Sequence, residues 1–297
     1  MRRLLTVLVV VIVCVFYFYH ERRTPAQVPA IEQTGAPAAA APASRGSFDP
    51  ATHIAVVHTK DFAFEAPDSI TAGWTTFHLI NDGPALHHVQ LVRLDSGKTL
   101  TDLEAALKTQ GPPPRWAAFV GGPNAPNPGA ESDAMFNLPA GSYAMICMVD
   151  LPGGVPHFAK GMVHAFTVTA STSAPAAEPT TDETIALADY NFGIKGALKS
   201  GPHTIKIVNN GPQPHEMELA QLAPGKTPKD LLNWLVKPDG PPPGNAIGGV
   251  SMMMPGTSGY FTTTLTPGNY VMLCFIPDAK DGKPHFAHGM LKQITVN

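Results

Sequence analysis

The chain of 297 residues contains one long sequence pattern twice. Segments that lie 127 to 129 residues apart match over nearly 120 residues, a period far longer than the roughly 20 to 50 residues of solenoid repeats. The matching pairs are NDGP at 81–84 with NNGP at 209–212, YAMIC at 143–147 with YVMLC at 270–274, and PHFAKGM at 156–162 with PHFAHGM at 284–290. The pattern predicts two copies of a whole domain, residues 51–170 and 183–297, joined by a linker at 171–182.

Each copy is expected to consist mainly of β-strands. The stretches from Thr76 to Leu79 and from Thr204 to Ile207 alternate polar and apolar side chains, which is typical of half-buried strands. The 31 prolines and 27 glycines of the chain favour turns over long helices. One helix per copy is expected, because Thr227 to Asp230 offers a cap, a proline and an acid before an apolar stripe. The predicted fold class is mainly β: two β-sandwiches in tandem, each with a short helical insertion, after an N-terminal membrane segment.

Residues 1–23 are expected to be a signal peptide or membrane anchor. Arg2 and Arg3 precede an uncharged, mostly apolar run from Leu4 to Tyr19, which is short for a membrane span but long enough for a signal-peptide core. No small-x-small cleavage site follows the run, which favours an uncleaved anchor over a cleaved peptide. Residues 24–50 are rich in Ala and Pro and predict a disordered tether. The sequence thus predicts an exported, membrane-anchored protein with both domains on the periplasmic or extracytoplasmic side.

Charge and cysteine content argue against two classes of protein, nucleic-acid-binding proteins and disulfide scaffolds. Charged residues make up 14% of the chain, and 20 basic against 23 acidic residues leave a net charge of −3. A nucleic-acid-binding protein would carry a basic surface, so no nucleic-acid partner is expected. Of three cysteines, one lies in the apolar run, and the other two, Cys147 and Cys274, belong to different copies. A disulfide scaffold is therefore not expected.

The repeat also separates histidines that recur from those that do not. Two pairs match between the copies, and so do the two cysteines and one pair of methionines that follows them. The seven histidines without a counterpart, which we interpret mostly as surface residues, are His53, His58, His78, His88, His164, His203 and His288. The recurring set is His, Cys, His and Met in that order. Its members are His87, Cys147, His157 and Met162 in the first copy, and His215, Cys274, His285 and Met290 in the second.

Two imidazoles, a thiolate and a weak axial thioether are the ligand set of a blue-copper site. The sequence therefore predicts a metal site in each copy. His88 is the weaker alternative to His87, because the HxxxL stretches of the two copies align only when His87 matches His215. The competing interpretation is that copying preserved a structural loop that has lost its metal. An unpaired thiol in an exported domain is open to oxidation unless it is buried or metal-bound, which favours the metal site.

These motifs resemble those of the cupredoxins of the plastocyanin and azurin type. The resemblance covers residues 51–297 and lies in NDGPALH and NNGPQPH before the first histidine, GSYAMIC and GNYVMLC ending in the cysteine, and PHFAKGM and PHFAHGM. It implies a Greek-key β-sandwich with type 1 copper near one end of each domain, two coppers in total. Nine residues separate Cys147 from His157 and ten separate Cys274 from His285. This spacing is longer than in small plastocyanin-like carriers and leaves the loop shape and the exposure of the copper open.

The expected function is one-electron transfer between redox protein partners. Apolar residues of the Cys–His loops, namely Val155, Phe158, Ile276 and Phe286, are the expected docking patch. Enzymatic activity is not expected, because two-domain copper nitrite reductases and oxidases place a histidine next to the type 1 cysteine. Here the cysteines are flanked by Ile146, Met148, Leu273 and Phe275.

Two other functions remain open from the sequence. A copper chaperone, store or sensor is suggested by Met252, Met253 and Met254, since thioethers are soft ligands for Cu(I). A metal-free cupredoxin-like binding module is the other alternative.

Overall fold

The computed structural model describes residues 46–109, 113–172 and 176–297. The expected signal peptide or anchor, and most of the expected tether, lie outside these residues. Among the residues described, no helix is long and apolar enough to cross a membrane. The C-terminal end of the stretch expected to be a tether is ordered, because Ser47–Asp49 forms strand β1 and pairs with Ile54–Lys60, strand β2.

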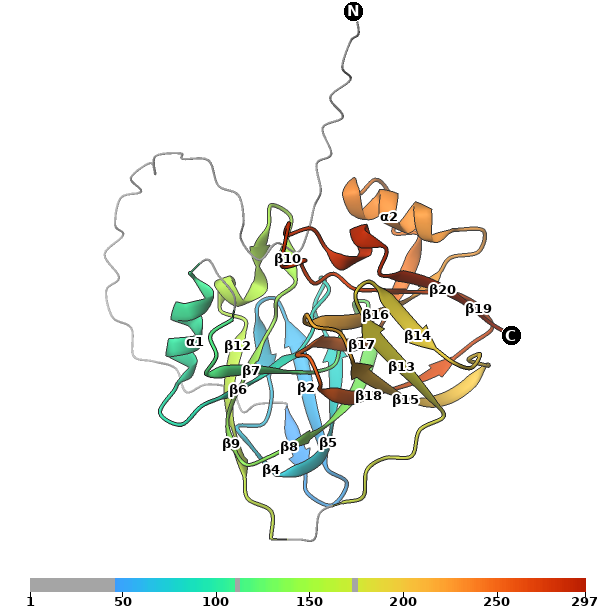
Figure 1. Cartoon of the computed structure of the whole chain (residues 1–297). Helices are drawn as coiled ribbons and strands as arrows, with labels where there is room; N and C mark the ends of the chain where they lie inside the picture. Colours follow the sequence, from blue (N-terminus) through green and yellow to red (C-terminus); the bar gives the residue numbers. More distant parts are fainter. Residues whose placement is uncertain (1–45, 110–112, 173–175) are drawn as a thin grey trace, which may run out of the picture.

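The first half of the chain folds into two sheets (Figure 1). One contains β1, β2, β3 (Ala63–Glu65), β5 (Gly73–Asn81) and β8 (Glu131–Leu138), and the other contains β4 (Ser69–Thr71), β12 (Val163–Thr169), β9 (Gly141–Ile146), β6 (Gln90–Leu94) and β7 (Ala117–Gly121), in that order. Neighbouring strands such as β6 and β9 are not consecutive in the sequence, because the chain crosses between the sheets. This is the predicted Greek-key sandwich.

The second half has the same plan. Its strands β13 (Glu183–Ala188), β14 (Asn191–Ile194), β15 (Gly201–Asn209) and β18 (Ser258–Leu265) lie in one sheet, and β17 (Gly244–Met253), β16 (His215–Leu222), β19 (Gly268–Leu273) and β20 (Leu291–Val296) form the other. The two halves are thus mainly β, as the alternating strand patterns predict.

The two halves share one sheet. Strand β8 pairs antiparallel with β18, with Ala134 opposite Phe261, so the sheet of nine strands runs through both sandwiches. Backbone hydrogen bonds also join the loop after β7 to β17: the Asn124 N–H donates to the Gly249 carbonyl at 3.1 Å, and the Ser251 N–H donates to the Gly122 carbonyl at 2.9 Å. The halves are therefore fixed against each other by main-chain contacts, an arrangement that the sequence pattern does not predict.

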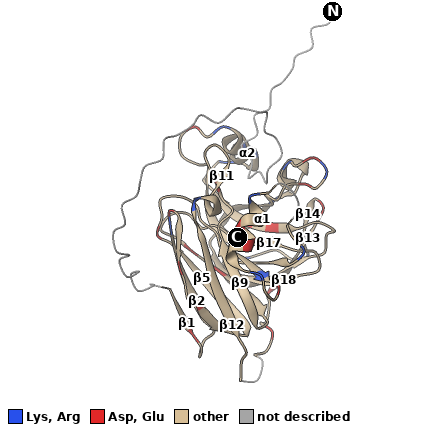
Figure 2. Ribbon diagram, turned by 90° about the vertical axis from the view of Figure 1, so that its left-hand side faces the viewer, with Lys and Arg blue, Asp and Glu red and all other residues tan. Residues whose placement is uncertain are grey.

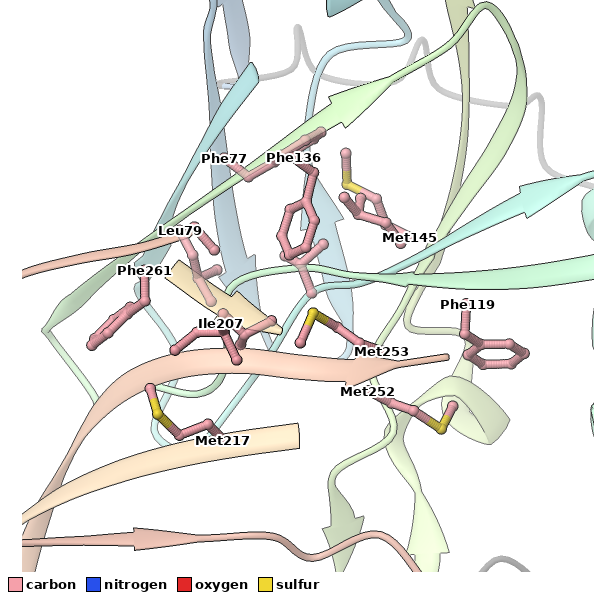
Figure 3. Packing of buried hydrophobic residues seen from close by; sticks show 14 of the residues in the cluster. Phe77, Leu79, Phe119, Phe136, Met145, Ile207, Met217, Met252, Met253 and Phe261 are labelled. Atoms are coloured by element: carbon pink, nitrogen blue, oxygen red, sulfur yellow. The ribbon is translucent and has the colours of Figure 1, made fainter. Parts of the chain in front are cut away.

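Close packing accompanies this pairing. An added Cβ at Gly259 would come within 2.2 Å of the Phe136 ring, so the ring lies directly on the backbone of the neighbouring half. Met252 and Met253 are buried and lie among the core side chains (Figure 3). Their placement is that of packing residues, and Met254 is partly buried against the same core.

Within the described residues, each half carries one short α-helix, as expected. Helix α1 spans Leu100–Leu107 and helix α2 spans Pro228–Val236. Thr99 and Thr227 cap them, and in both cases the carboxylate of an aspartate three residues later accepts a hydrogen bond from the N–H of the cap residue. Charged residues are scattered over a largely uncharged ribbon (Figure 2).

Candidate metal centres

The first histidine of each set is positioned by a turn built on an asparagine. Asn81 donates through Nδ2 to the carbonyls of Ala85 and Pro126 at 2.9 and 3.0 Å, and its Oδ1 accepts from the N–H of Gly83. A Cβ at Gly83 would lie 2.7 Å from Nε2 of His87, so only glycine allows this approach. Asn209 makes the same bonds in the second half, before His215.

The cysteine, the second histidine and the methionine are held together by main-chain hydrogen bonds. Cys147 follows β9, its N–H donates to the carbonyl of Met162 at 3.2 Å, and its carbonyl accepts from Phe158 at 2.8 Å. The N–H of Met162 in turn donates to the carbonyl of His157, which begins a 3-10 turn, η1 (His157–Lys160). The long loop between Cys147 and His157 is closed by two short paired strands, β10 (Asp150–Leu151) and β11 (Val155–Pro156).

The second half repeats these contacts. The N–H of Cys274 donates to the carbonyl of Met290 at 3.3 Å, and the N–H of Met290 donates to the carbonyl of His285 at 2.9 Å. His285 begins the 3-10 turn η2 (His285–His288). All four residues of each set are thus brought to one end of their sandwich.

In each half, the two histidines and the cysteine converge. Nδ1 of His87 lies 3.1 Å from Nδ1 of His157, and Sγ of Cys147 lies 3.5 Å from the latter. The corresponding distances in the second half are 3.0 and 3.4 Å, with 4.0 Å from Sγ of Cys274 to Nδ1 of His215. These six residues are at most 1% exposed, and both methionines are fully buried.

An aspartate fixes the orientation of the first imidazole in each half. Nε2 of His87 lies 2.7 Å from Oδ1 of Asp61, and Nε2 of His215 lies 2.7 Å from Oδ1 of Asp189. A carboxylate accepts only, so the proton sits on Nε2 and the lone pair of Nδ1 faces the second histidine and the cysteine. The sequence pattern alone does not assign these aspartates to the site, although Asp61 and Asp189 also match between the copies.

An aromatic ring covers the second histidine. Phe62 packs edge-on against His157 at 5.0 Å between ring centroids, and Tyr190 packs in the same way against His285 at 5.3 Å. The Tyr190 hydroxyl donates to Asp278. Nε2 of His285 has no hydrogen-bond partner and lies 4.0 Å from Oδ2 of Asp278. The second site therefore has a polar cover where the first has an apolar one.

Burial sets the protonation of these groups. Desolvation lowers the pKa of His157 and of His285 to about 4, with the neighbouring histidine as the second cause. Desolvation likewise raises the pKa of the Cys147 thiol to about 12, and that of Cys274 well above its usual value. At neutral pH the imidazoles are therefore neutral, and each thiol keeps its proton until a metal ion displaces it.

The donor set fits a bound metal ion. A zinc ion, for example, forms bonds of about 2.0 Å to nitrogen and about 2.3 Å to sulfur. Donor atoms that lie 3.0 to 3.5 Å apart can therefore surround one ion of this size. Because Asp61 and Asp189 hold the proton on Nε2, the Nδ1 lone pairs of the first histidines point into this space. The soft sulfur and the two imidazoles suit copper or zinc better than hard cations such as magnesium.

Two expectations about neighbouring residues need correction. His88 is 7% exposed and not a surface residue: Nε2 accepts from the N–H of Met148 at 2.9 Å, and burial lowers its pKa to about 4. Its counterpart Glu216 is buried too, and accepts from the N–H of Phe275. The sequence comparison did not select these residues because a histidine in one copy is aligned with a glutamate in the other. In the structure both occupy the same position, and each accepts a hydrogen bond from the N–H of the residue after the cysteine.

The expected docking patch is also only partly at the surface. Ile276 and Phe286 are each 9% exposed, so the second loop turns its apolar residues inward. In the first loop Val155 is 41% exposed and Phe158 is half-buried.

No protein-family model and no curated protein matches the chain. Solved structures do match. An auracyanin from Roseiflexus castenholzii is 24% identical, covering 38% of this chain and 94% of its own, with a TM-score of 0.27. A multicopper oxidase is 12% identical, with coverages of 86% and 94% and a TM-score of 0.26. A copper-containing nitrite reductase from Thermus scotoductus is 11% identical, with coverages of 82% and 61% and a TM-score of 0.22.

The chain has a cupredoxin-like fold. Its strand order and paired sandwiches carry this assignment. The expectation that it is not an enzyme is contradicted, because an oxidase and a nitrite reductase are among those matches. Copper binding is supported by the two groups of His, Cys and His, because this donor set suits copper.

Proposed function

We propose that the chain is a copper-binding electron-transfer protein with one type 1 copper ion in each half. The observation that carries the proposal is the repetition of one buried donor arrangement, with nearly equal distances, in both sandwiches. The proposed ligands are His87, Cys147, His157 and Met162 in the first half, and His215, Cys274, His285 and Met290 in the second.

A copper ion held by these residues would accept and release one electron, since such a ligand set suits both of its oxidation states. Asp61 and Asp189 hold the imidazoles in the tautomer that presents Nδ1. The hydrogen bonds from Cys147 to Met162 and from Met162 to His157 limit how far the donor atoms can move. A rigid donor set keeps the reorganisation on electron transfer small.

The proposed partners are redox proteins that approach the first half. Val155 of the first Cys–His loop is a large hydrophobic residue that is 41% exposed, and Phe158 next to His157 is half-buried. A partner that covers this loop would come close to the first donor set. The equivalent residues of the second loop are turned inward, so the second half offers less apolar surface there.

The test is redox cycling of the full-length chain after addition of Cu(II). The proposal predicts an intense thiolate-to-copper band that disappears on reduction with ascorbate, returns on reoxidation with ferricyanide, and survives repeated cycles with constant bound copper. Zn(II) in place of Cu(II) is the matched control and gives no band. Loss of copper on the first reduction would point to a copper-handling protein, and absence of copper binding to a metal-free module; either result contradicts the proposal.

A further inference from the structure

The two donor sets match, but the residues that cover the second histidine of each set do not. At three aligned positions the second half has a polar side chain and the first half has an apolar one. Each position stands at a fixed distance in the sequence from a matched residue: one after the aspartate of the site, two before the first histidine and four after the cysteine. The polar residues are Tyr190, Gln213 and Asp278, and their apolar counterparts are Phe62, Ala85 and Leu151.

Three hydrogen bonds hold the Asp278 carboxylate in place. The Tyr190 hydroxyl donates to Oδ2, as does Nε2 of Gln213 at 2.9 Å. The Lys280 N–H donates to Oδ1 at 2.8 Å. A carboxylate that accepts this many hydrogen bonds keeps its negative charge at neutral pH. The Asp278 side chain is only 2% exposed, so salt and water screen this charge little.

The charge of Asp278 faces the second histidine of the second donor set. Oδ2 of Asp278 lies 4.0 Å from Nε2 of His285, a nitrogen that has no hydrogen-bond partner. Nδ1 of His285 faces the other donors, so Nε2 is the nitrogen that carries the proton of the neutral ring. In the described part of the chain no lysine or arginine is paired with Asp278, because Lys283 and His288 contact Asp281 instead. No paired cation therefore cancels the charge beside His285.

The same place in the first half is apolar. Leu151 and Ala85 have no side-chain acceptor, and Phe62 packs edge-on against His157. The first loop does carry an acid, Asp150, but its side chain is partly exposed, and solvent screens such a charge more strongly than a buried one. The second histidines of the two halves therefore have different electrostatic surroundings.

A buried negative charge beside a ligand favours the more positive state of a bound ion. Cu(II) carries one positive charge more than Cu(I), so a carboxylate next to a ligating imidazole stabilises Cu(II) and lowers the reduction potential. The effect is larger in a buried site than in water, because the effective dielectric constant is lower. Net charge and hydrogen bonds around a metal site are among the features that set its potential.

We propose that Asp278, positioned by Tyr190 and Gln213, lowers the reduction potential of the second copper site, so that the first half takes up an electron before the second. This inference rests on the proposed function and concerns how the two sites differ. Asp278 acts through His285 and is a positioning residue, not a ligand. A chain that has received one electron would carry it in the first half, where Val155 is exposed for a partner.

Potentials measured by spectroelectrochemistry on the thiolate-to-copper band of full-length variants test this. Cys147→Ser leaves a type 1 site only in the second half and Cys274→Ser only in the first, so each variant reports one site. We expect the lower potential in Cys147→Ser. Adding Asp278→Asn to that variant should raise its potential by about 59 mV or more, which is a tenfold change in the equilibrium constant for one electron.

Asp281→Asn is the matched control, because it removes the same charge from the same loop. Its side chain is 35% exposed and already paired with Lys283, so the potential of the second site should not change. An unchanged potential in Asp278→Asn, or a second site whose potential equals or exceeds that of the first, overturns the inference and leaves the proposed function intact. Absence of the band in the unaltered chain contradicts the proposed function, and the inference with it. If Asp278→Asn does not fold, the order of the potentials in the two cysteine variants decides alone.

Discussion

Replacing Asp61 with Asn tests how the first imidazole is oriented. Oδ1 of Asp61 lies 2.7 Å from Nε2 of a histidine that is fully buried, whereas the Asp61 side chain is 31% exposed. The partly exposed carboxylate therefore contacts the buried ring at Nε2. Asparagine would keep the size of the side chain and remove its charge. Loss of such a partner to a ligating histidine lowers metal affinity by roughly 10- to 100-fold, about 1.4 to 2.7 kcal/mol of binding free energy.

Competition for Cu(II) with a chelating dye at pH 7 measures this loss. The unaltered chain should bind two copper ions tightly, and Asp61→Asn should weaken one of them by that factor while the other is unchanged. Asp189→Asn, which removes the matching contact of His215, should weaken the other site alone. Asp68→Asn is the control, because its side chain is 92% exposed. Equal affinity in all four proteins would refute the role of Asp61 and Asp189 as positioning residues.

Three further predictions concern protonation and packing. Copper binding at pH 7 should release about one proton per ion, because the Cys147 thiol, with its pKa raised to about 12, is protonated and His157, with its pKa lowered to about 4, is not; titration calorimetry in buffers of different ionisation enthalpy measures it, and two protons or none contradicts it. Burial raises the pKa of Glu216 to about 7 in the folded chain, so its ionisation costs stability as pH rises from 4.5 through 7. Glu216→Gln should therefore be more stable than the unaltered copper-free chain by up to about 3 kcal/mol at pH 8 and by little at pH 4.5, as urea unfolding would test; a gain independent of pH speaks against this cause. Gly259→Ala should lower the free energy of unfolding by about 1 to 3 kcal/mol, because the new methyl would meet the Phe136 ring; unchanged thermal melting would exclude that contact.

The internal repeat explains why the donor sets could be proposed from sequence. His87 and His215, or Cys147 and Cys274, stand in equal positions of two copies, and side chains required in both copies recur whereas surface side chains drift. The alternation in β5 and β15 likewise reports which face of each strand is buried. The alternation along a strand depends only on residues that are close together in the sequence.

The relation between the halves depends on contacts that no local pattern encodes. Pairing of β8 with β18 joins residues such as Ala134 and Phe261 that are far apart in the chain. His88 lies at this junction, because its Nδ1 is 3.3 Å from Oδ1 of Asn124, and the Asn124 N–H donates to the Gly249 carbonyl of the second half. His88 and Glu216 are also different residue types, so a comparison of the two copies that keeps only identical residues does not select them.

Counting copper in the full-length chain and in two variants shows whether each half binds one copper ion. We expect two bound coppers and an intense thiolate-to-copper band in the unaltered chain. Cys147→Ser and Cys274→Ser should each bind one copper in the blue form and keep about half of the band, and the double variant should have no band. A band of full intensity in either single variant, or no band in the unaltered chain, would rule out one type 1 copper ion in each half.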